Sequence, residues 1–476
     1  MLMSRNQFTA MVGQLSDRWL PFADAASQEL SLSRLFRLSL FQVSVGMSLV
    51  LLSGTLNRIM VVELGRAAWL VSLMLAIPLL LAPARALIGF RSDFHRSFLG
   101  WRRVPYLWIG TLLQFGGLAI MPFALIVMTE PHSGPEWIGT AASMLAFVLV
   151  GLGVHTSQTA GLALATDLAS DKTRPSVVAI LYLMLLVGMI VAALGFAALL
   201  SDFGYVRLIR VIQGAAVITL VLNLVAMWKQ EQRRPELTRH DRERPPFWDA
   251  WHSLTRNSSL SRLLIAIALG TAGFAMQDVL LEPYGAQVLG LSVSDTTLLT
   301  ALMSAGMVVA LIIASRLLAE DADPIRLAAH GALLGVFAFA GVVLSGPLDS
   351  TILFQIGTIL IGLGNGLFAV GGLTAAMVMG SADSAGLTLG AWGAVQATAT
   401  GLAVFAGGAI RDLVTSVVAG SAMDQSLGST LAGYASVYHL EILILFVAMV
   451  ALGPLVGLCS SRNDSQTGLQ LADFPS

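Results

Sequence analysis

Apolar segments, each long enough to cross about 30 Å of hydrocarbon, recur along almost the whole chain. Only 12% of the 476 residues are charged, whereas soluble domains carry about a quarter. The short alternating segments of a membrane β-barrel do not occur in the sequence. The sequence therefore predicts an all-α membrane protein with twelve transmembrane helices, near 40–63, 67–90, 104–128, 137–165, 176–200, 206–228, 262–288, 296–318, 327–346, 351–378, 386–410 and 437–458.

One long polar stretch, from Lys229 to Arg262, interrupts this pattern and is rich in arginine. It cannot cross hydrocarbon, because each Lys or Arg at the centre of a span costs about 2.5–3.5 kcal/mol. Apolar and basic residues at 27–41 suit either a helix lying at the membrane interface or a simple extension of the first span. We therefore expect an N-terminal segment at 1–39, six-helix bundles at 40–228 and 262–458, a basic linker at 229–261 and a tail at 459–476.

Basic residues gather on one side of the predicted spans, in the linker and in the loops that contain, for example, Arg96, Lys172 and Arg326. The positive-inside rule therefore predicts that the linker and both termini are cytoplasmic. The linker arginines also predict attraction to anionic membrane lipid. The single cysteine, Cys459, excludes an internal disulfide and a Cys-based metal cluster, and the charge pattern does not support nucleic-acid binding.

The two halves of the sequence carry a loose internal similarity. Gly54–Gly65 aligns with Val279–Gly290, and both segments end in Leu-Gly. Gly151-Leu-Gly153 aligns in the same way with Gly362-Leu-Gly364. With six predicted helices in each half, these matches indicate parallel repeats related by an axis along the membrane normal.

The segment between the second and third predicted spans resembles a signature of the major facilitator superfamily. It reads Gly89-Phe-Arg-Ser-Asp93 and, after an insertion, Gly100-Trp-Arg102-Arg103. The resemblance implies the fold of that superfamily, two pseudo-repeats of six helices, in which Asp93, Arg102 and Arg103 latch the halves together on the cytoplasmic side. Ordinary positive-inside charge is the alternative, and it explains the arginines but not Asp93 or the glycines.

Further stretches in both halves carry a closer resemblance, to the bacteriochlorophyll delivery family of purple photosynthetic bacteria, which comprises the PucC and LhaA proteins. The length of the chain favours the members that serve the light-harvesting 1 antenna. The most specific stretch is Gln277–Gly285, which reads Gln-Asp-Val-Leu-Leu-Glu-Pro-Tyr-Gly. The other stretches are Leu56–Leu64, Gly100–Tyr106, Ala165–Leu168 with Arg174-Pro175, and Gly390–Thr398.

This resemblance implies a non-enzymatic assembly factor of the bacterial inner, intracytoplasmic membrane. Such a factor binds bacteriochlorophyll and assists its delivery to light-harvesting 1 antenna polypeptides. The implied partners are those polypeptides, the reaction centre–light-harvesting 1 complex and bacteriochlorophyll synthase. Two alternatives remain on the same fold, a proton-coupled small-solute transporter and a pigment-free scaffold for antenna assembly.

His155 is the candidate axial ligand to the magnesium of the pigment, a role that the resemblance implies. Ionisable groups within a span are expensive, so each one is a candidate site. The neighbouring Gly151, Gly153 and Gly161 leave space for a flat macrocycle, and Gln158 lies close enough along the helix to assist. The alternative is a hydrogen bond between helices at a seam of small residues.

Polar residues near the predicted outer ends of the first and seventh spans form the second candidate site. Arg58 and Glu282 occupy equivalent depths in the two repeats, and an isolated buried charge is costly, so we expect them to pair and hold the two helices together. Asn57 and Glu282 are also candidates for pigment contact. Gln277 and Asp278 offer oxygen donors of the kind that magnesium prefers.

Overall fold

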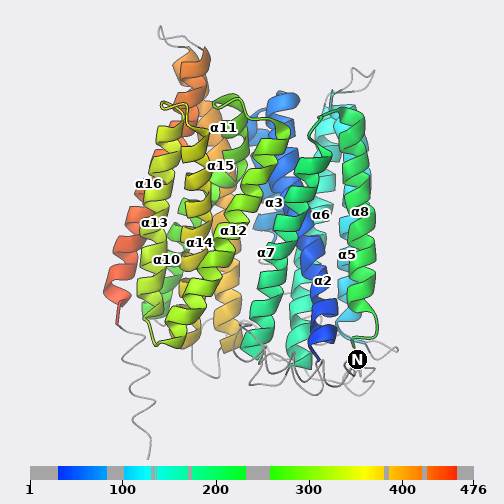
Figure 1. Ribbon diagram of the computed structural model, residues 1–476, viewed down its shortest axis with the longest axis vertical. Helices are drawn as coiled ribbons and strands as arrows, with labels where there is room; N and C mark the ends of the chain where they lie inside the picture. Colours follow the sequence, from blue (N-terminus) through cyan, green and yellow to red (C-terminus); the bar gives the residue numbers. More distant parts are fainter. Residues whose placement is uncertain are drawn as a thin grey trace, which may run out of the picture.

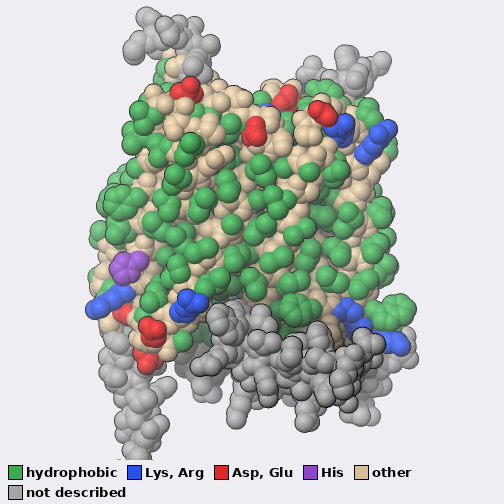
Figure 2. All heavy atoms as spheres, in the orientation of Figure 1, with side chains coloured by type: hydrophobic (Ala, Val, Ile, Leu, Met, Phe, Trp, Pro, Cys, Tyr) green, Lys and Arg blue, Asp and Glu red, His purple; other side chains and the backbone are tan. Residues whose placement is uncertain are grey.

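The chain folds into a bundle of long helices that run between two ends of the molecule (Figure 1). The structure, a computed structural model, describes residues 31–82, 101–129, 135, 137–169, 174–231, 258–379, 385–420 and 426–457. Within these residues eleven helices are long and apolar enough to cross a membrane, and the shorter apolar helix Ala68–Leu80 stands where the second span is predicted. Figure 2 shows Lys, Arg, Asp and Glu near the two ends of the visible face, with an apolar band between them. The chain is a multi-pass membrane protein.

The described helices follow the predicted order of spans. The N-terminal half contains α2 (Leu32–Leu49) with its π-helical continuations η2 (Val50–Leu56) and η3 (Ile59–Glu63), α3 (Ala68–Leu80), α5 (Val104–Thr129), α6 (Trp137–Leu168), α7 (Arg174–Leu199) and α8 (Tyr205–Met227). The C-terminal half contains α10 (Ser258–Ala275), the 3-10 segment η5 (Met276–Val279), α11 (Leu281–Gln287), α12 (Val293–Ala319), α13 (Pro324–Ser345), α14 (Thr351–Met379), α15 (Ala385–Ala419), α16 (Ser426–Leu452) and η7 (Gly453–Leu455).

Contacts between helices repeat in the two halves. α2 packs on α7 and α8, and α10 packs on α15 and α16. In the same way α5 contacts α6 and α8, while α13 contacts α14 and α16. Between the halves, α3 packs on α15 and α7 packs on α12, and these two contacts exchange when the helices of one half are mapped onto those of the other. The halves are therefore pseudo-repeats, as the internal similarity predicts.

The first helix of each half loses regular α-helical geometry near the same end of the bundle. α2 passes into η2 and η3, whereas α10 passes into η5 before α11 resumes. The break in the second case has a covalent cause. Pro283 has no N–H, so the carbonyl of Val279, four residues earlier, loses the donor that a continuous helix would supply. The two irregular segments contact one another between the halves.

Three helix boundaries bear on the expectations above: one decides between two alternatives, and two differ from the predicted spans. The helix that contains the first span already begins at Leu32, so the extension of that span, and not a separate interfacial helix, accounts for residues 32–41. α15 runs to Ala419 instead of ending at 410, and α16 begins at Ser426 instead of 437. Arg411 does not end α15 because its charge is satisfied locally, by an ion pair with Asp412 at 2.7 Å.

Candidate functional site at the contact between the two halves

Asn57 reaches across from the first span to the break in the seventh. Its Nδ2 donates to the carbonyl oxygen of Val279 at 2.9 Å, which is the carbonyl that Pro283 leaves without a helical donor. Asn57 is fully buried. A buried carbonyl without a partner costs about 1–3 kcal/mol, so this side chain stabilises the break from the opposite half of the molecule.

Glu282 lies against the same irregular part of the first span. Its Oε1 accepts a hydrogen bond from the hydroxyl of Thr300 at 2.7 Å, and the residue is 4% exposed. A Cβ added at Gly54 would lie only 2.6 Å from that Oε1, so the absence of a side chain at Gly54 is what allows the carboxyl to approach. The second oxygen, Oε2, has no hydrogen-bond partner among the described residues.

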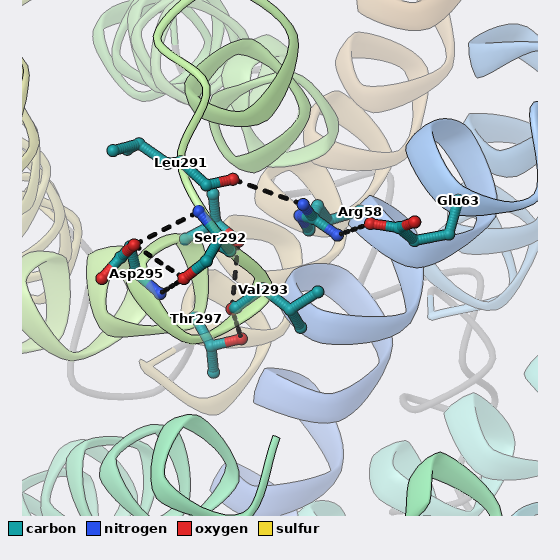
Figure 3. Close-up of polar contacts among 8 residues, drawn as sticks. Arg58, Glu63, Leu291, Ser292, Val293, Asp295 and Thr297 are labelled. Carbon is teal, nitrogen blue, oxygen red and sulfur yellow. Dashed lines mark hydrogen bonds and ion pairs between the residues drawn. The ribbon is translucent and has the colours of Figure 1, made fainter. Parts of the chain in front are cut away.

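The predicted ion pair between Arg58 and Glu282 is not formed. Arg58 Nη1 instead pairs with Glu63 Oε1 at 2.6 Å, one turn further along its own helix (Figure 3). Arg58 Nη2 donates to the carbonyl oxygen of Leu291 at 3.4 Å, which still links the first span to the other half. The prediction matched depths in the two repeats but overlooked Glu63, a carboxylate that needs no contact between the halves to reach the guanidinium.

A second contact closes the same end of the bundle, which we call the outer end because the charge pattern predicts it to be non-cytoplasmic. Asp412 Oδ2 on α15 accepts the backbone N–H of Trp69 at 2.8 Å, and Trp69 is in the first turn of α3. A carboxylate at a helix N-terminus is stabilised by the free N–H groups there. Arg411, its ion-pair partner, also donates to Gln287 at 2.7 Å.

Gln277 and Asp278 lie on η5 and meet a carboxylate that the sequence analysis did not single out. Glu441 Oε1 on α16 accepts the backbone N–H of Gln277 at 2.6 Å. Gln277 Nε2 in turn donates to Asp278 Oδ1 at 2.5 Å. Glu441 is fully buried, and it could have been found by the rule already applied to His155, since it is a lone carboxylate within a predicted span.

The glycines beside His155 do not leave open space. A Cβ added at Gly153 would lie 2.5 Å from the backbone nitrogen of Gln114 on α5, and one at Gly161 would lie 2.5 Å from the ring of Phe41 on α2. Gly151 is covered by Pro78 of α3. The prediction of a macrocycle slot at these glycines is therefore wrong, because neighbouring helices occupy it. His155 itself is 7% exposed.

The structure separates the two groups of predicted site residues. Asn57, Gln277, Asp278 and Glu282 lie where the irregular segments of the two halves meet. His155 and Gln158 lie on α6, which packs on α2, α3, α5 and α7.

Arg102 and Arg103 form contacts within the N-terminal half. Both approach Asp167 Oδ2 on α6, at 3.3 and 2.9 Å. The carboxylate of Glu231, after α8, accepts the backbone N–H groups of Arg102, Arg103 and Val104 at 2.6–3.1 Å and so caps the N-terminus of α5. Asp167 lies in the N-terminal half and Glu231 directly follows it. The predicted latch between the halves also involves Asp93, which lies outside the described residues, so it stays a prediction.

Solved structures place this arrangement in a known class. The chain resembles a bacterial homologue of the human lysosomal transporter Spinster, in an inward-facing and unoccupied conformation, with a TM-score of 0.68 and 14% sequence identity over 90% of this chain and 97% of that chain. At this identity the likeness shows the fold alone. The chain therefore has the fold of the major facilitator superfamily.

Sequence comparison gives the family. A family model described as PUCC protein matches residues 55–459. A protein of Rhodobacter capsulatus, described as an uncharacterized protein in the puhA-bchM intergenic region, is 50% identical to this chain, and the alignment covers the full length of both proteins. Protein PucC of Rhodovulum sulfidophilum is 54% identical over 85% of this chain and 90% of its own length. The chain belongs to the PucC family.

Proposed function

We propose that this protein binds bacteriochlorophyll and assists its delivery to light-harvesting 1 antenna polypeptides as photosynthetic complexes assemble. The observation that carries the proposal is membership of the PucC family, with about half of all residues identical to those relatives over most or all of the chain. In this proposal the protein is non-enzymatic and lies in the bacterial inner membrane with both termini in the cytoplasm. Its partners are antenna polypeptides, the reaction centre–light-harvesting 1 complex and bacteriochlorophyll synthase.

The donor groups of the chain fit a pigment better than a chelated metal ion. Among the described residues no group of three or more His, Cys, Asp or Glu side chains is placed to hold a metal ion. The magnesium of a chlorophyll is already held by its macrocycle, so one further axial ligand is enough. A single imidazole such as that of His155 supplies one nitrogen ligand and releases it again, whereas a chelating cluster would retain the cargo.

One face of α6 supports a role for Gln158 beside His155. On the helix, Gln158 lies between Gly161, which faces α2, and Gly151, which faces α3. This face therefore points toward α3, which packs on α15, and toward α2, whose continuation η2 contacts α12. Gln158, Leu162 and Thr166 along this face are partly exposed. We assign His155 to the magnesium and Gln158 to a peripheral carbonyl of the pigment or to a bound water.

Asn57, Arg58 and Glu282 receive a structural role in this proposal. Asn57 donates to Val279, Arg58 is paired with Glu63, and Glu282 is bonded to Thr300. Side chains that already satisfy buried groups of the protein are poor candidates for a ligand that must be released, because each exchange would expose an unsatisfied polar group.

The proposal is tested by the near-infrared absorption spectrum of gently purified protein, which should contain a stoichiometric bacteriochlorophyll band. His155→Leu should fold and insert but lose most of this pigment, and His155→Asn should retain part of it, since an amide oxygen still coordinates a hard cation. His439→Leu is the matched control, an exposed histidine on α16 whose Nδ1 lies 2.6 Å from the carbonyl of Ala435.

Two outcomes contradict the proposal. A colourless but well-folded wild-type preparation argues for a transporter or a pigment-free scaffold. An unchanged ratio of pigment to protein in His155→Leu, together with a loss of stability of about 0.6–2 kcal/mol, shows instead that His155 serves a hydrogen bond between helices.

A further inference from the structure

Glu441 is a carboxyl group buried in the C-terminal half with one oxygen unused. Its Oε1 accepts the N–H of Gln277 at 2.6 Å, while Oε2 has no hydrogen-bond partner among the described residues. The residue is fully buried. An ionised carboxylate with an unsatisfied oxygen is one of the most unfavourable groups that an apolar interior can contain.

A second carboxyl, that of Asp278, lies within electrostatic range of Glu441. The two are connected through one residue, because Gln277 gives its backbone N–H to Glu441 and its side-chain N–H to Asp278. Unlike Glu441, Asp278 is partly exposed. The partly exposed carboxyl therefore offers an approach to the buried one.

No cation in the described part of the chain balances this pair. Neither Asp278 nor Glu441 forms an ion pair with a Lys, Arg or His of the described residues, and Arg411 on the adjacent α15 is already paired with Asp412. The described donors that reach the two carboxyls are the neutral N–H groups of Gln277, which carry no charge to balance them. Tyr438 lies one turn before Glu441 on α16 and its buried hydroxyl has no described partner, and Gln277 Oε1 is also without one.

We infer that Asp278 and Glu441 form a proton-binding carboxyl pair at the break in the seventh span, entered from the side of Asp278. A bound cation stabilises this arrangement, because the two carboxyl groups share only the N–H donors of Gln277 and repel each other in an apolar interior when both are ionised. A proton is the smallest such cation, and it also turns Glu441 Oε2 into a donor. The site uses no feature of the proposed pigment site, so the two inferences stand or fall separately.

Infrared spectroscopy of the purified full-length protein in nanodiscs tests the inference. A protonated carboxylic acid has a C=O stretching band that is separate from the carboxylate bands and moves when H₂O is exchanged for D₂O. The wild-type protein at neutral pH should show such a band, and Glu441→Gln should lose the share of one carboxylic acid from its area. Glu441→Gln keeps the oxygen that accepts the N–H of Gln277.

Two further variants keep the test decisive if Glu441→Gln does not fold. Asp278→Asn should also reduce or shift the band, and Tyr438→Phe should shift its frequency. Glu320→Gln is the matched control, because Glu320 is an exposed carboxylate at the end of α12 and should leave the band unchanged. A band that is the same in Glu441→Gln and Asp278→Asn overturns the inference. The inference is also overturned if the wild-type protein shows no carboxylic acid band and sodium ions stabilise it but not Glu441→Gln. The bound cation is then sodium.

Discussion

Arg58 and Glu63 should be strongly coupled in energy, and Arg58 and Glu282 more weakly, because only Glu63 forms an ion pair with the guanidinium. The two side chains of the pair are 5% and 31% exposed. Exposed pairs contribute about 0.2–1 kcal/mol, and breaking a fully buried pair costs about 3–5 kcal/mol. An arginine that is buried and a glutamate that is one-third exposed lie between these limits, and we expect a coupling free energy of about 1–2 kcal/mol.

The single substitutions should be unequal. Glu63→Ala leaves a buried guanidinium without its anion, so it should lower the free energy of unfolding by about 2–3 kcal/mol. Arg58→Met keeps an unbranched apolar side chain and leaves a carboxylate that water can reach, so its effect should be about 1–2 kcal/mol. The weak bond from Arg58 Nη2 to Leu291 at 3.4 Å adds little to either value.

Double-mutant cycles on reversible unfolding in mixed micelles measure these terms. Arg207 and Asp202 provide a control cycle, because their side chains are 46% and 88% exposed at a separation of 3.3 Å and should show almost no coupling. Additive effects for Arg58 and Glu63, or a larger coupling between Arg58 and Glu282 than between Arg58 and Glu63, would refute the assignment of the pair.

Three further outcomes are expected. Glu231→Gln should lower the free energy of unfolding by about 1–2 kcal/mol, because the charged cap for the N–H groups of Arg102, Arg103 and Val104 at the start of α5 becomes neutral. Glu320→Gln, an exposed change at the end of α12, should have no effect in the same assay. Gly153→Ala should lower the free energy of unfolding by about 1–3 kcal/mol, because the added methyl group overpacks against Gln114. Gly116→Ala on α5 is the control, since its methyl group meets no neighbouring atom within 4 Å and should be neutral or stabilising. Equal melting temperatures of the two variants would contradict the packing argument. The linker should be protected from protease by nanodiscs of anionic lipid, in a salt-sensitive way, since each basic residue contributes about 1 kcal/mol near such a surface. Changing Arg233, Arg234, Arg239, Arg242 and Arg244 to Gln should abolish this protection. Protection that survives the change, together with loss of a co-purifying protein, would show that the linker docks a partner instead.

Most of the fold follows from the sequence because membrane spans depend on composition over many residues. A single charge does not change that average, but it misplaces a boundary. The predicted span ended at 410, directly before Arg411, while the structure continues the helix through this residue, whose charge is paired with Asp412 one residue later. Pairing within one helix cannot be distinguished from an exposed end by hydropathy alone.

The candidate site was less predictable, because it depends on which of several polar groups meet. Matched depth in the repeats brought Asn57 and Glu282 to the contact between the halves but gave Arg58 the wrong partner. Small residues beside His155 were compatible with a ligand and with helix packing, and only the positions of Gln114 and Phe41 decide for packing. Glu441 is distant in sequence from Gln277, so no local pattern connects them.

One side chain from each half of the molecule stabilises the break in the seventh span. The break is therefore coupled to how the two halves contact one another. Glu441 satisfies the N–H of Gln277 from within the C-terminal half, so this contact does not depend on how the two halves are placed. Asn57 satisfies the carbonyl of Val279 from the N-terminal half, so separation at the outer end leaves that carbonyl without its donor. The loss of this bond costs about 1–3 kcal/mol unless water enters. The bond from Asn57 to Val279 therefore stabilises the contact between the two halves at the outer end, and a substitution that removes it should weaken that contact.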